Sequence, residues 1–315
     1  MSPSAADPST RSACCPGVCA PWQRPSSSRS PARCSGGPPG TPSERTPVDL
    51  DDLLGLARDA ARAGARTAAS WRGRAHRLLV EEKAGPDDLV SQADRDTERA
   101  VRAVLSEHRP HDTIWGEEEG TTVGHGGVRW IIDPIDGTTN YLYGRPDWAV
   151  SVAAADTAGD RLLAGVVIEP ALGLLTEARV GTRTTANGTP VAPLGQNDLT
   201  RALVELNFGR PAQRPMAGPT VSALLPQVRD LRRGGSAAAA LAQVATGRAD
   251  ALWAPGLQPW DCAAGILLVQ QAGGTAGDLT GPVPGSWPRS GDVLAAPAGL
   301  WEPLRALLAP VLLAG

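Results

Sequence analysis

The chain has 315 residues, of which 42% are hydrophobic, and a formal net charge of −3 at pH 7. This composition predicts a globular protein with a sizeable core, and the charge provides no basic field of the kind that attracts nucleic acid or anionic membranes. No apolar run approaches the roughly 20 residues that span a bilayer, and the N-terminus lacks a secretion-type hydrophobic segment. We therefore expect a cytoplasmic protein without nucleic-acid or membrane partners.

Residues 1–45 are expected to form a disordered, low-complexity leader. They are rich in Ser, Pro, Arg and Gly, show no hydrophobic periodicity, and include Cys14, Cys15, Cys19 and Cys34. No second Cys pair or His cluster accompanies these cysteines, so a leader is favoured over a zinc site. The folded domain is expected to cover residues 46–315, with an α+β half over 46–197 and an α/β half over 198–315.

Two amphipathic helices are predicted at the start of the folded domain. Between residues 48 and 71, leucines and alanines recur every three or four positions, which is the period of a helix with one buried face. A second pattern of this kind covers residues 87–108 and ends before Pro110. We expect these two helices to pack together.

Short strands are predicted next, where apolar and β-branched runs are bounded by Gly and Pro. They are expected near Ile114 and at residues 130–132, 148–155, 162–170 and 172–180. The sequence NGTP at 187–190 predicts a hairpin turn, because Asn187 and Gly188 tolerate positive φ.

Strands and helices alternate after residue 198. Strands are predicted at 202–208, 249–253 and 292–297, helices at 220–231, 236–246, 261–272 and 299–313, and a Pro/Gly-rich surface loop at 281–288. The whole order indicates an α+β arrangement followed by an α/β arrangement.

Two acids follow the apolar start of the sequence WIIDPIDGTTNYLYGRP at residues 130–146. An unpaired carboxylate is costly to bury, so acids at this place need water or a counter-charge. Pro134 biases Asp133 toward an extended backbone, and Asp133 and Asp136 can then point into one pocket that suits a hard divalent cation. The alternative is structural: Asp133 ends a strand and Asp136 caps a following helix.

Other acids hold comparable positions along the chain. Glu117 in WGEEEG follows a predicted strand, Asp261 in PWDCAAG begins a predicted helix, and Asp88 and Asp94 fall in the second predicted helix. Each has a structural explanation of its own, as part of a solvated turn, as an N-cap or as a solvent-facing helical residue. It is their combination that indicates a metal site.

The motifs DPIDGTT and WDCAAG, together with the Glu-Glu pair after a strand, closely resemble those of the magnesium-dependent inositol monophosphatase family. The resemblance extends over roughly residues 48 to 312. It implies an α+β fold, namely the layered αβαβα sandwich of the inositol monophosphatase and fructose bisphosphatase type. It also implies a homodimer that hydrolyses a small phosphate monoester.

The resemblance implies two to three Mg²⁺ ions in each site. Asp133 would bridge the two main ions, and hard oxygen ligands without His or Cys suit this cation. The implied metal ligands are the carboxylates of Glu117, Asp133, Asp136 and Asp261, the backbone carbonyl of Ile135, and Asp88 near the weakly held third ion.

The resemblance also implies catalytic and substrate-binding roles. Thr138 would orient the attacking water, Glu117 would accept its proton, and Asp94 would hold the threonine. Backbone N–H groups at a helix N-terminus would bind the phosphate. The implied substrate-binding residues are Asp136, Gly137, Thr138, Thr139, Ser236 and Ala237, together with Lys83, which stands where the family has a lysine.

Inositol 1-phosphate is the favoured substrate, although one position departs from the family pattern. Ala254 stands where many inositol phosphatases carry a glutamate that binds the polyol, and the lost charged hydrogen bond is worth about 1.5 to 3 kcal/mol. Histidinol phosphate and sugar bisphosphates are alternative substrates. A non-catalytic, protein-binding regulatory role is the alternative from another class.

Overall fold

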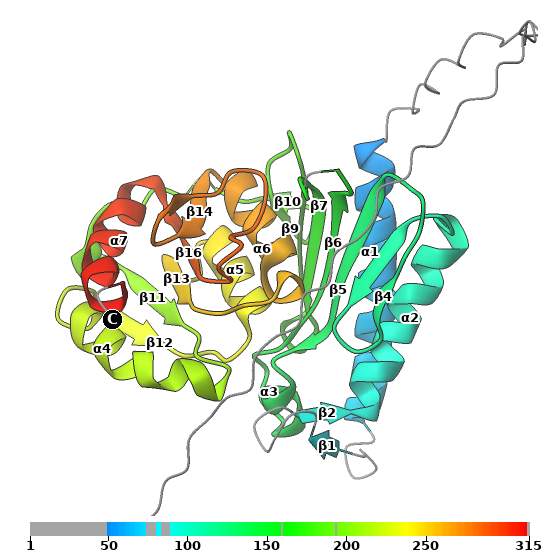
Figure 1. Ribbon diagram of the computed structural model, residues 1–315, viewed down its shortest axis with the longest axis horizontal. Coiled ribbons are helices and arrows are strands. Elements are labelled where there is room, and N and C mark those ends of the chain that lie inside the picture. Colours follow the sequence, from blue (N-terminus) through cyan, green and yellow to red (C-terminus); the bar gives the residue numbers. More distant parts are fainter. Residues whose placement is uncertain (1–48, 74–79, 83–88, 159, 193, 314–315) are drawn as a thin grey trace, which may run out of the picture. The chain divides into compact units, whose positions relative to one another are not determined.

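Two large β-sheets alternate with three layers of helices in the computed structural model, which describes residues 49–73, 80–82, 89–158, 160–192 and 194–313. The order of the layers is α1 and α2, the eight-stranded sheet, α5 and α6, the six-stranded sheet, and finally α4 and α7 (Figure 1). This arrangement confirms the predicted αβαβα sandwich. Among the described residues, no helix is both long and apolar enough to cross a membrane. The predicted leader lies outside the described residues and stays a prediction.

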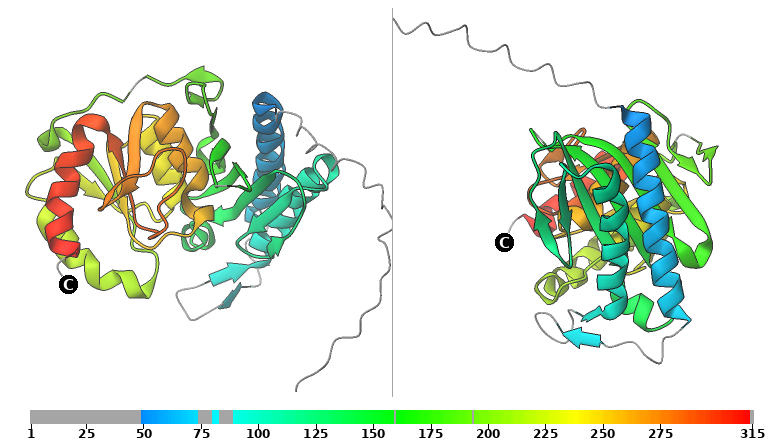
Figure 2. Two further views of the ribbon diagram at one scale, coloured as in Figure 1. Left: turned by 45° about the horizontal axis from the view of Figure 1, so that its top comes forward. Right: turned by 90° about the vertical axis from the view of Figure 1, so that its right-hand side faces the viewer.

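The first layer consists of α1 (Leu50–Arg72) and α2 (Gln92–His108), which lie side by side on the eight-stranded sheet (Figure 2, right). Both predicted helices and their pairing are confirmed. A Cβ atom on Gly64 would lie 2.7 Å from Cγ2 of Val101, so a glycine is needed where the helices approach each other. The second helix starts later than predicted, because Leu89–Ser91 forms strand β2 and pairs with β1 (Val80–Glu82).

The first sheet has the order β10-β9-β8-β7-β6-β5-β3-β4 and is antiparallel except between β3 and β5. Helices cover both faces, which explains why its central strands are apolar almost throughout. The turn at Asn187 and Gly188 has φ values of 47° and 79°, which confirms the predicted hairpin. The strands are β3 (Thr113–Gly116), β4 (Gly120–Thr122), β5 (Val128–Asp136), β6 (Ala149–Asp156), β7 (Leu162–Glu169), β8 (Leu174–Arg179), β9 (Thr185–Ala186) and β10 (Thr189–Pro190).

The second sheet has the order β12-β11-β13-β16-β14-β15 and mixes parallel with antiparallel pairs. Its strands are β11 (Leu203–Leu206), β12 (Asp230–Arg232), β13 (Ala251–Ala254), β14 (Gly274–Asp278), β15 (Gly281–Pro282) and β16 (Val293–Pro297). The remaining helices are α3 (Thr138–Leu142), α4 (Arg214–Leu224), α5 (Ala237–Ala245), α6 (Pro259–Gln271) and α7 (Ala298–Leu312), with 3₁₀ turns at Pro170–Leu172, Leu199–Arg201 and Pro211–Gln213.

The middle helices α5 and α6 lie between the two sheets and are buried almost all round, as their high content of Ala and other apolar residues requires. Strand β5 contributes to two cores, because side chains alternate along a strand. Trp130 and Ile132 pack against the first helical layer, whereas Ile131 faces the middle helices. The end of β5 is thereby held between two packed layers.

Two predictions in the second half are wrong in their boundaries. The helix predicted at 220–231 begins at Arg214 and ends at Leu224, and the end of the predicted segment forms the edge strand β12. The surface loop predicted at 281–288 contains strand β15, and Trp287 within it is only 3% exposed. Pairing with a neighbouring strand accounts for β12 and β15.

Candidate active site

Three carboxylates meet where β5 ends and α6 begins. One carboxylate oxygen from each of Asp133, Asp136 and Asp261 lies within 4.8 Å of the other two. Residues three apart in a regular strand face opposite sides. The pairing of β5 with β6 shifts register between Asp133 and Asp136, and a bulge of this kind can turn two such side chains toward one place.

Asp133 is the deeply buried member of this cluster, with 1% exposure. Neither of its carboxylate oxygens has a hydrogen-bond partner in the part of the chain that the structure describes. Burial, together with the charges of Glu117, Asp136, Asp261 and Asp94, raises the pKa of Asp133 well above its usual range. Two buried oxygens without a proton donor, in an all-oxygen cluster, fit a hard divalent cation such as Mg²⁺.

Asp136 and Asp261 are held by the starts of the two middle helices. Oδ2 of Asp136 accepts hydrogen bonds from Oγ of Ser236 at 2.6 Å and from the backbone N–H of Ala238 at 2.5 Å. Burial raises the pKa of Asp136 to about 7 even though these hydrogen bonds oppose the shift. Asp261 accepts from the backbone N–H of Gln258 at 2.7 Å, and burial followed by the charges of its acidic neighbours raises its pKa as well.

The start of α3 places a hydroxyl beside the carboxylates. Oγ1 of Thr138 lies 3.1 Å from Oδ1 of Asp94 and 3.1 Å from the carbonyl oxygen of Ile135, so its single proton is directed to these two acceptors. The lone pairs of that hydroxyl are then left to accept a hydrogen bond from a water. Gly137 before it has φ of 91°, and a Cβ there would lie 3.0 Å from the carbonyl oxygen of Asp147. Only glycine fits this turn without strain.

A cavity opens beside the cluster and brings together the end of β5 and the segments that follow β11 and β13. Glu117 lines it, although it is not one of the three carboxylates that meet within 4.8 Å. The other lining residues are Asp136, Gly137, Thr138, Thr139, Asn207, Gly209, Arg210, Gln213, Gly235, Ala237, Gly256, Leu257 and Asp261.

Asn207, Arg210 and Gln213 lie between β11 and α4 and were not expected at the site. Gln213 donates to the carbonyl oxygen of Gly256 at 3.2 Å and accepts from the N–H of Arg210 at 3.0 Å, which fixes this segment against the loop that leads to α6. The sequence carries no distinctive signal for them, because Asn207 falls near the end of the predicted strand at 202–208 and Arg210 and Gln213 follow it in an ordinary polar loop. Since β11 and β13 are parallel neighbours, their carboxyl ends open on the same edge.

Two positions singled out in the sequence fall outside the described residues, and two others, Ser236 and Ala254, do not line the cavity. Lys83 and Asp88 lie outside the described residues, so their roles stay predictions. Ser236 is 1% exposed and does not line the cavity, because its hydroxyl is engaged with Asp136. Ala254 is buried in β13 and does not line the cavity either.

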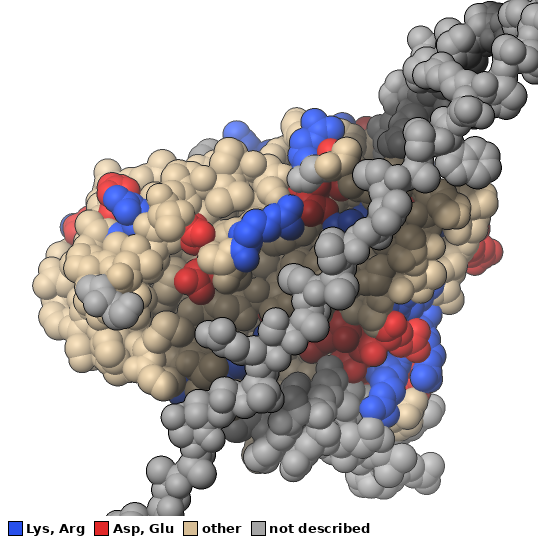
Figure 3. Space-filling view, in the orientation of Figure 1, with Lys and Arg blue, Asp and Glu red and all other residues tan. Residues whose placement is uncertain are grey.

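Charged groups on the face shown in Figure 3 form small, mixed clusters. Acidic (red) and basic (blue) side chains lie close to one another, and the described surface over α4 and α7 is mostly uncharged. On this face the described residues form no extended basic surface.

A profile of the inositol monophosphatase family matches residues 49–312, nearly all of the described chain. The chain belongs to the inositol monophosphatase family. Like other members of that family, it is a phosphoric monoester hydrolase.

Named relatives and solved structures of the inositol monophosphatase family agree with this assignment. Inositol-1-monophosphatase SuhB of Mycobacterium tuberculosis is 39% identical over 243 residues, which cover 73% of this chain and 81% of the relative. A protein named Nus factor SuhB, from Pseudomonas aeruginosa, is 36% identical over 74% of this chain and 87% of its own length. The crystal structure of extragenic suppressor protein suhB from Bartonella henselae has a TM-score of 0.77 and 32% identity, covering 82% of this chain and 98% of that one.

Proposed function

We propose that this protein hydrolyses inositol 1-phosphate to inositol and phosphate in a Mg²⁺-dependent reaction. The observation that carries the proposal is Asp133, whose two buried oxygens have no hydrogen-bond partner among the described residues and lie in a cluster with Asp136 and Asp261. The names of relatives such as inositol-1-monophosphatase SuhB support the choice of substrate.

Two Mg²⁺ ions fit the ligands that the described residues supply. Glu117, Asp133 and the carbonyl oxygen of Ile135 would hold one ion, while Asp133, Asp136 and Asp261 would hold the other. When bound, Mg²⁺ lowers the pKa of a coordinated water and neutralises phosphate oxygens and the leaving alkoxide. Asp88 would approach a third ion.

Side chains of the protein orient the attacking water and accept its proton. The Thr138 hydroxyl, with its proton engaged by Asp94 and Ile135, accepts a hydrogen bond from the attacking water and fixes its direction. Glu117 lines the same cavity and takes the proton that this water releases. The N–H groups of Gly137, Thr138 and Thr139 bind the phosphate oxygens.

A sugar bisphosphate is the second candidate substrate, and Arg210 favours it. Arg210 lines the same cavity as the carboxylates, and its positive charge opposes the upward shift of the Asp261 pKa. The cation is therefore placed to pair with a second anionic group on the substrate, whereas Ala254 offers no acceptor to a polyol hydroxyl.

The test is phosphate release from inositol 1-phosphate, histidinol phosphate and fructose 1,6-bisphosphate, each with Mg²⁺ and with EDTA. We expect Mg²⁺-dependent cleavage with the highest kcat/KM for inositol 1-phosphate. The result that favours the second candidate is a preference for the bisphosphate that the substitution Arg210→Gln removes, while Arg201→Gln on the surface leaves it unchanged.

A regulatory role is the alternative from another class, and the name Nus factor SuhB of the Pseudomonas relative motivates it. Copurification of a protein partner without cleavage of any ester in the panel would favour that role over catalysis. A homodimer and a cytoplasmic location stay predictions, and size-exclusion chromatography with light scattering tests the former.

A further inference from the structure

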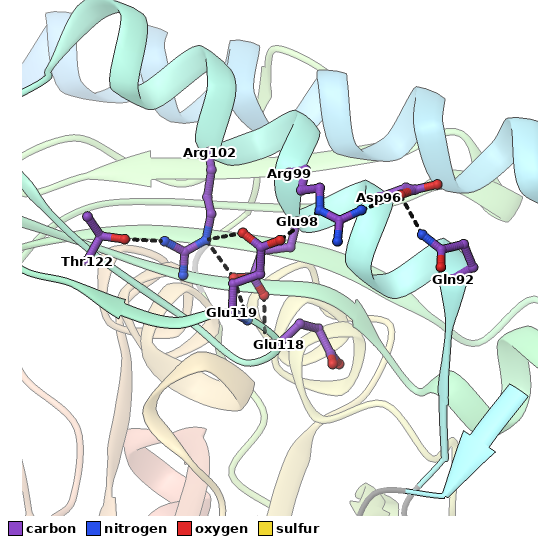
Figure 4. A network of polar contacts seen from close by, with 8 residues as sticks. All are labelled: Gln92, Asp96, Glu98, Arg99, Arg102, Glu118, Glu119 and Thr122. Atoms are coloured by element: carbon purple, nitrogen blue, oxygen red, sulfur yellow. Dashed lines mark hydrogen bonds and ion pairs between the residues drawn. The ribbon is translucent and has the colours of Figure 1, made fainter.

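A buried acid on α2 lies directly beneath the turn that carries Glu117. The side chain of Glu98 is fully buried. Its Oε2 accepts the backbone N–H of Glu118 at 2.7 Å, and its Oε1 accepts the backbone N–H of Glu119 at 3.1 Å (Figure 4). The chain just after Glu117 is thus bound to one carboxylate.

The chain just before Glu117 rests on the same carboxylate. A Cβ atom on Gly116 would lie 2.1 Å from Oε1 of Glu98, so the backbone there touches the buried acid. The N–H of Glu117 itself donates to the carbonyl oxygen of Ile132 at 3.2 Å, one residue before Asp133. Both neighbours of Glu117 therefore contact Glu98, while Glu117 is tied to β5.

Arg102 completes the arrangement one helical turn later. Its Nε donates to Oε1 of Glu98 at 2.7 Å, and its other nitrogens donate to Oγ1 of Thr122 at 3.1 Å and to the carbonyl oxygen of Gly120. The guanidinium thereby neutralises the buried acid and also fixes β4, which closes the turn after Glu119.

An outer part of this network is exposed and serves as an internal comparison. Arg99 pairs with Glu119 at 2.8 Å and with Asp96 at 3.0 Å, and Gln92 donates to Asp96 at 2.8 Å (Figure 4). Exposed pairs of this kind contribute little, because water screens them and the side chains lose freedom. The Glu119 side chain also meets Arg102, but at a longer 3.7 Å and from a partly exposed position, so it provides a matched control for Glu98.

We propose that Glu98 is a positioning residue for Glu117, and that it sets the affinity of the site for Mg²⁺ through the turn Gly116–Glu119. The inference rests on the proposed function, in which Glu117 is a metal ligand and the proton acceptor. A carboxylate accepts from both N–H groups and from Arg102 at once. Glutamine has the same shape but turns an NH₂ group toward one of these donors, so the turn must shift.

The experiment measures Mg²⁺ binding by isothermal titration calorimetry and the Mg²⁺ dependence of phosphate release for the wild type, Glu98→Gln and Glu119→Gln. Substitutions in groups that orient metal ligands typically weaken binding by about 10- to 100-fold, and we expect a loss in this range for Glu98→Gln. Glu119→Gln, which keeps its backbone N–H on Glu98, should bind Mg²⁺ as the wild type does.

A double-mutant cycle separates positioning from general stability. If Glu98 acts through Glu117, then adding Glu98→Gln to a Glu117→Gln background should change Mg²⁺ affinity no further. If Glu98→Gln does not fold, Glu98→Asp gives the same comparison, because it keeps the charge beside Arg102 but is too short to reach both N–H groups.

The outcomes distinguish the positioning role of Glu98 from the proposed phosphatase activity. Equal losses of Mg²⁺ affinity in the two backgrounds, or an unchanged affinity in folded Glu98→Gln, overturn the positioning role and leave the phosphatase proposal standing. A wild type that binds Mg²⁺ but cleaves no ester overturns the proposed activity, whereas the calorimetric cycle still decides the role of Glu98. A wild type that binds no Mg²⁺ overturns both.

Discussion

Asp133 is the residue on which the proposed chemistry depends, because it is buried without a proton donor in the described part of the chain. We expect Asp133→Asn to remain folded and to lose at least about a hundredfold in kcat/KM, since a metal ion supplies several kcal/mol of transition-state stabilisation. Circular dichroism checks the fold, and phosphate release checks the activity. Asp59→Asn, on the exposed side of α1, is the matched control, and full activity in Asp133→Asn would refute the metal assignment.

Thr138 is predicted to act through its hydroxyl and not through its shape. Thr138→Ser keeps the oxygen that contacts Asp94 and Ile135, whereas Thr138→Val keeps the volume and loses the oxygen. We expect kcat to fall about a hundredfold or more in the valine variant and only slightly in the serine variant, because a small misplacement of a reacting group costs about this much in rate. Steady-state kinetics with saturating Mg²⁺ give the comparison, and equal kcat values for the two variants would contradict the role.

Some site residues belong to motifs that can be recognised in the sequence, whereas others reach the site only through the tertiary structure. Asp133, Asp136 and Asp261 could be predicted because carboxylates at the ends of apolar strands and at helix starts are costly to bury without water or a counter-charge. Asn207, Arg210 and Gln213 could not, because their polar types are ordinary in a loop. They reach the cavity through the parallel pairing of β11 with β13 and the contact of Gln213 with Gly256.

At the scale of elements, two helical glycines give a matched stability experiment. A Cβ on Gly265 in α6 would lie 2.4 Å from Cβ of Leu241 in α5, whereas a Cβ on Gly55 in α1 would meet nothing within 4 Å. We expect Gly265→Ala to lower the free energy of unfolding by about 1 to 3 kcal/mol through overpacking. Gly55→Ala should raise it by about 0.4 to 1 kcal/mol through reduced freedom of the unfolded chain.

Urea unfolding of the metal-free protein measures both changes. The inference that α5 and α6 pack closely between the sheets fails if Gly265→Ala is as stable as Gly55→Ala.

Helices with a periodic apolar face could be predicted from the sequence, whereas segments defined by a partner strand could not. The period over residues 48–71 identifies α1, because one face must be buried. In contrast, Leu89–Ser91 forms a strand because β1 lies beside it, and Gly281–Pro282 because β14 does. Helix α4 also begins earlier than predicted, at Arg214 and Pro215, because the first turn of a helix tolerates proline.

For the molecule as a whole, the acid cluster makes stability depend on pH. The pKa of Asp136 is about 7 in the folded chain against an ordinary value of 3.8, and those of Asp133 and Asp261 are raised as well. Between these values the folded state binds more protons than the unfolded state. The free energy of unfolding contributed by the cluster therefore falls as pH rises through this range.

We expect metal-free protein to melt at a lower temperature at about pH 8 than at about pH 5, and Mg²⁺ to raise the melting temperature more at the higher pH, where the ligands are deprotonated. Differential scanning calorimetry with and without EDTA tests this. The pH dependence should shrink in Asp133→Asn, which removes one buried charge, and an unchanged dependence there would assign the effect to other groups.

The hydrogen bond from Ser236 to Asp136 joins residues that are 100 positions apart in the sequence. On a ribosome, the DPIDGTT segment emerges long before the partners that hold its second acid. A nascent chain must therefore keep these carboxylates hydrated until the middle helices have been synthesised. The active site should therefore form only late in synthesis, and a chain truncated before Ser236 should show no phosphatase activity.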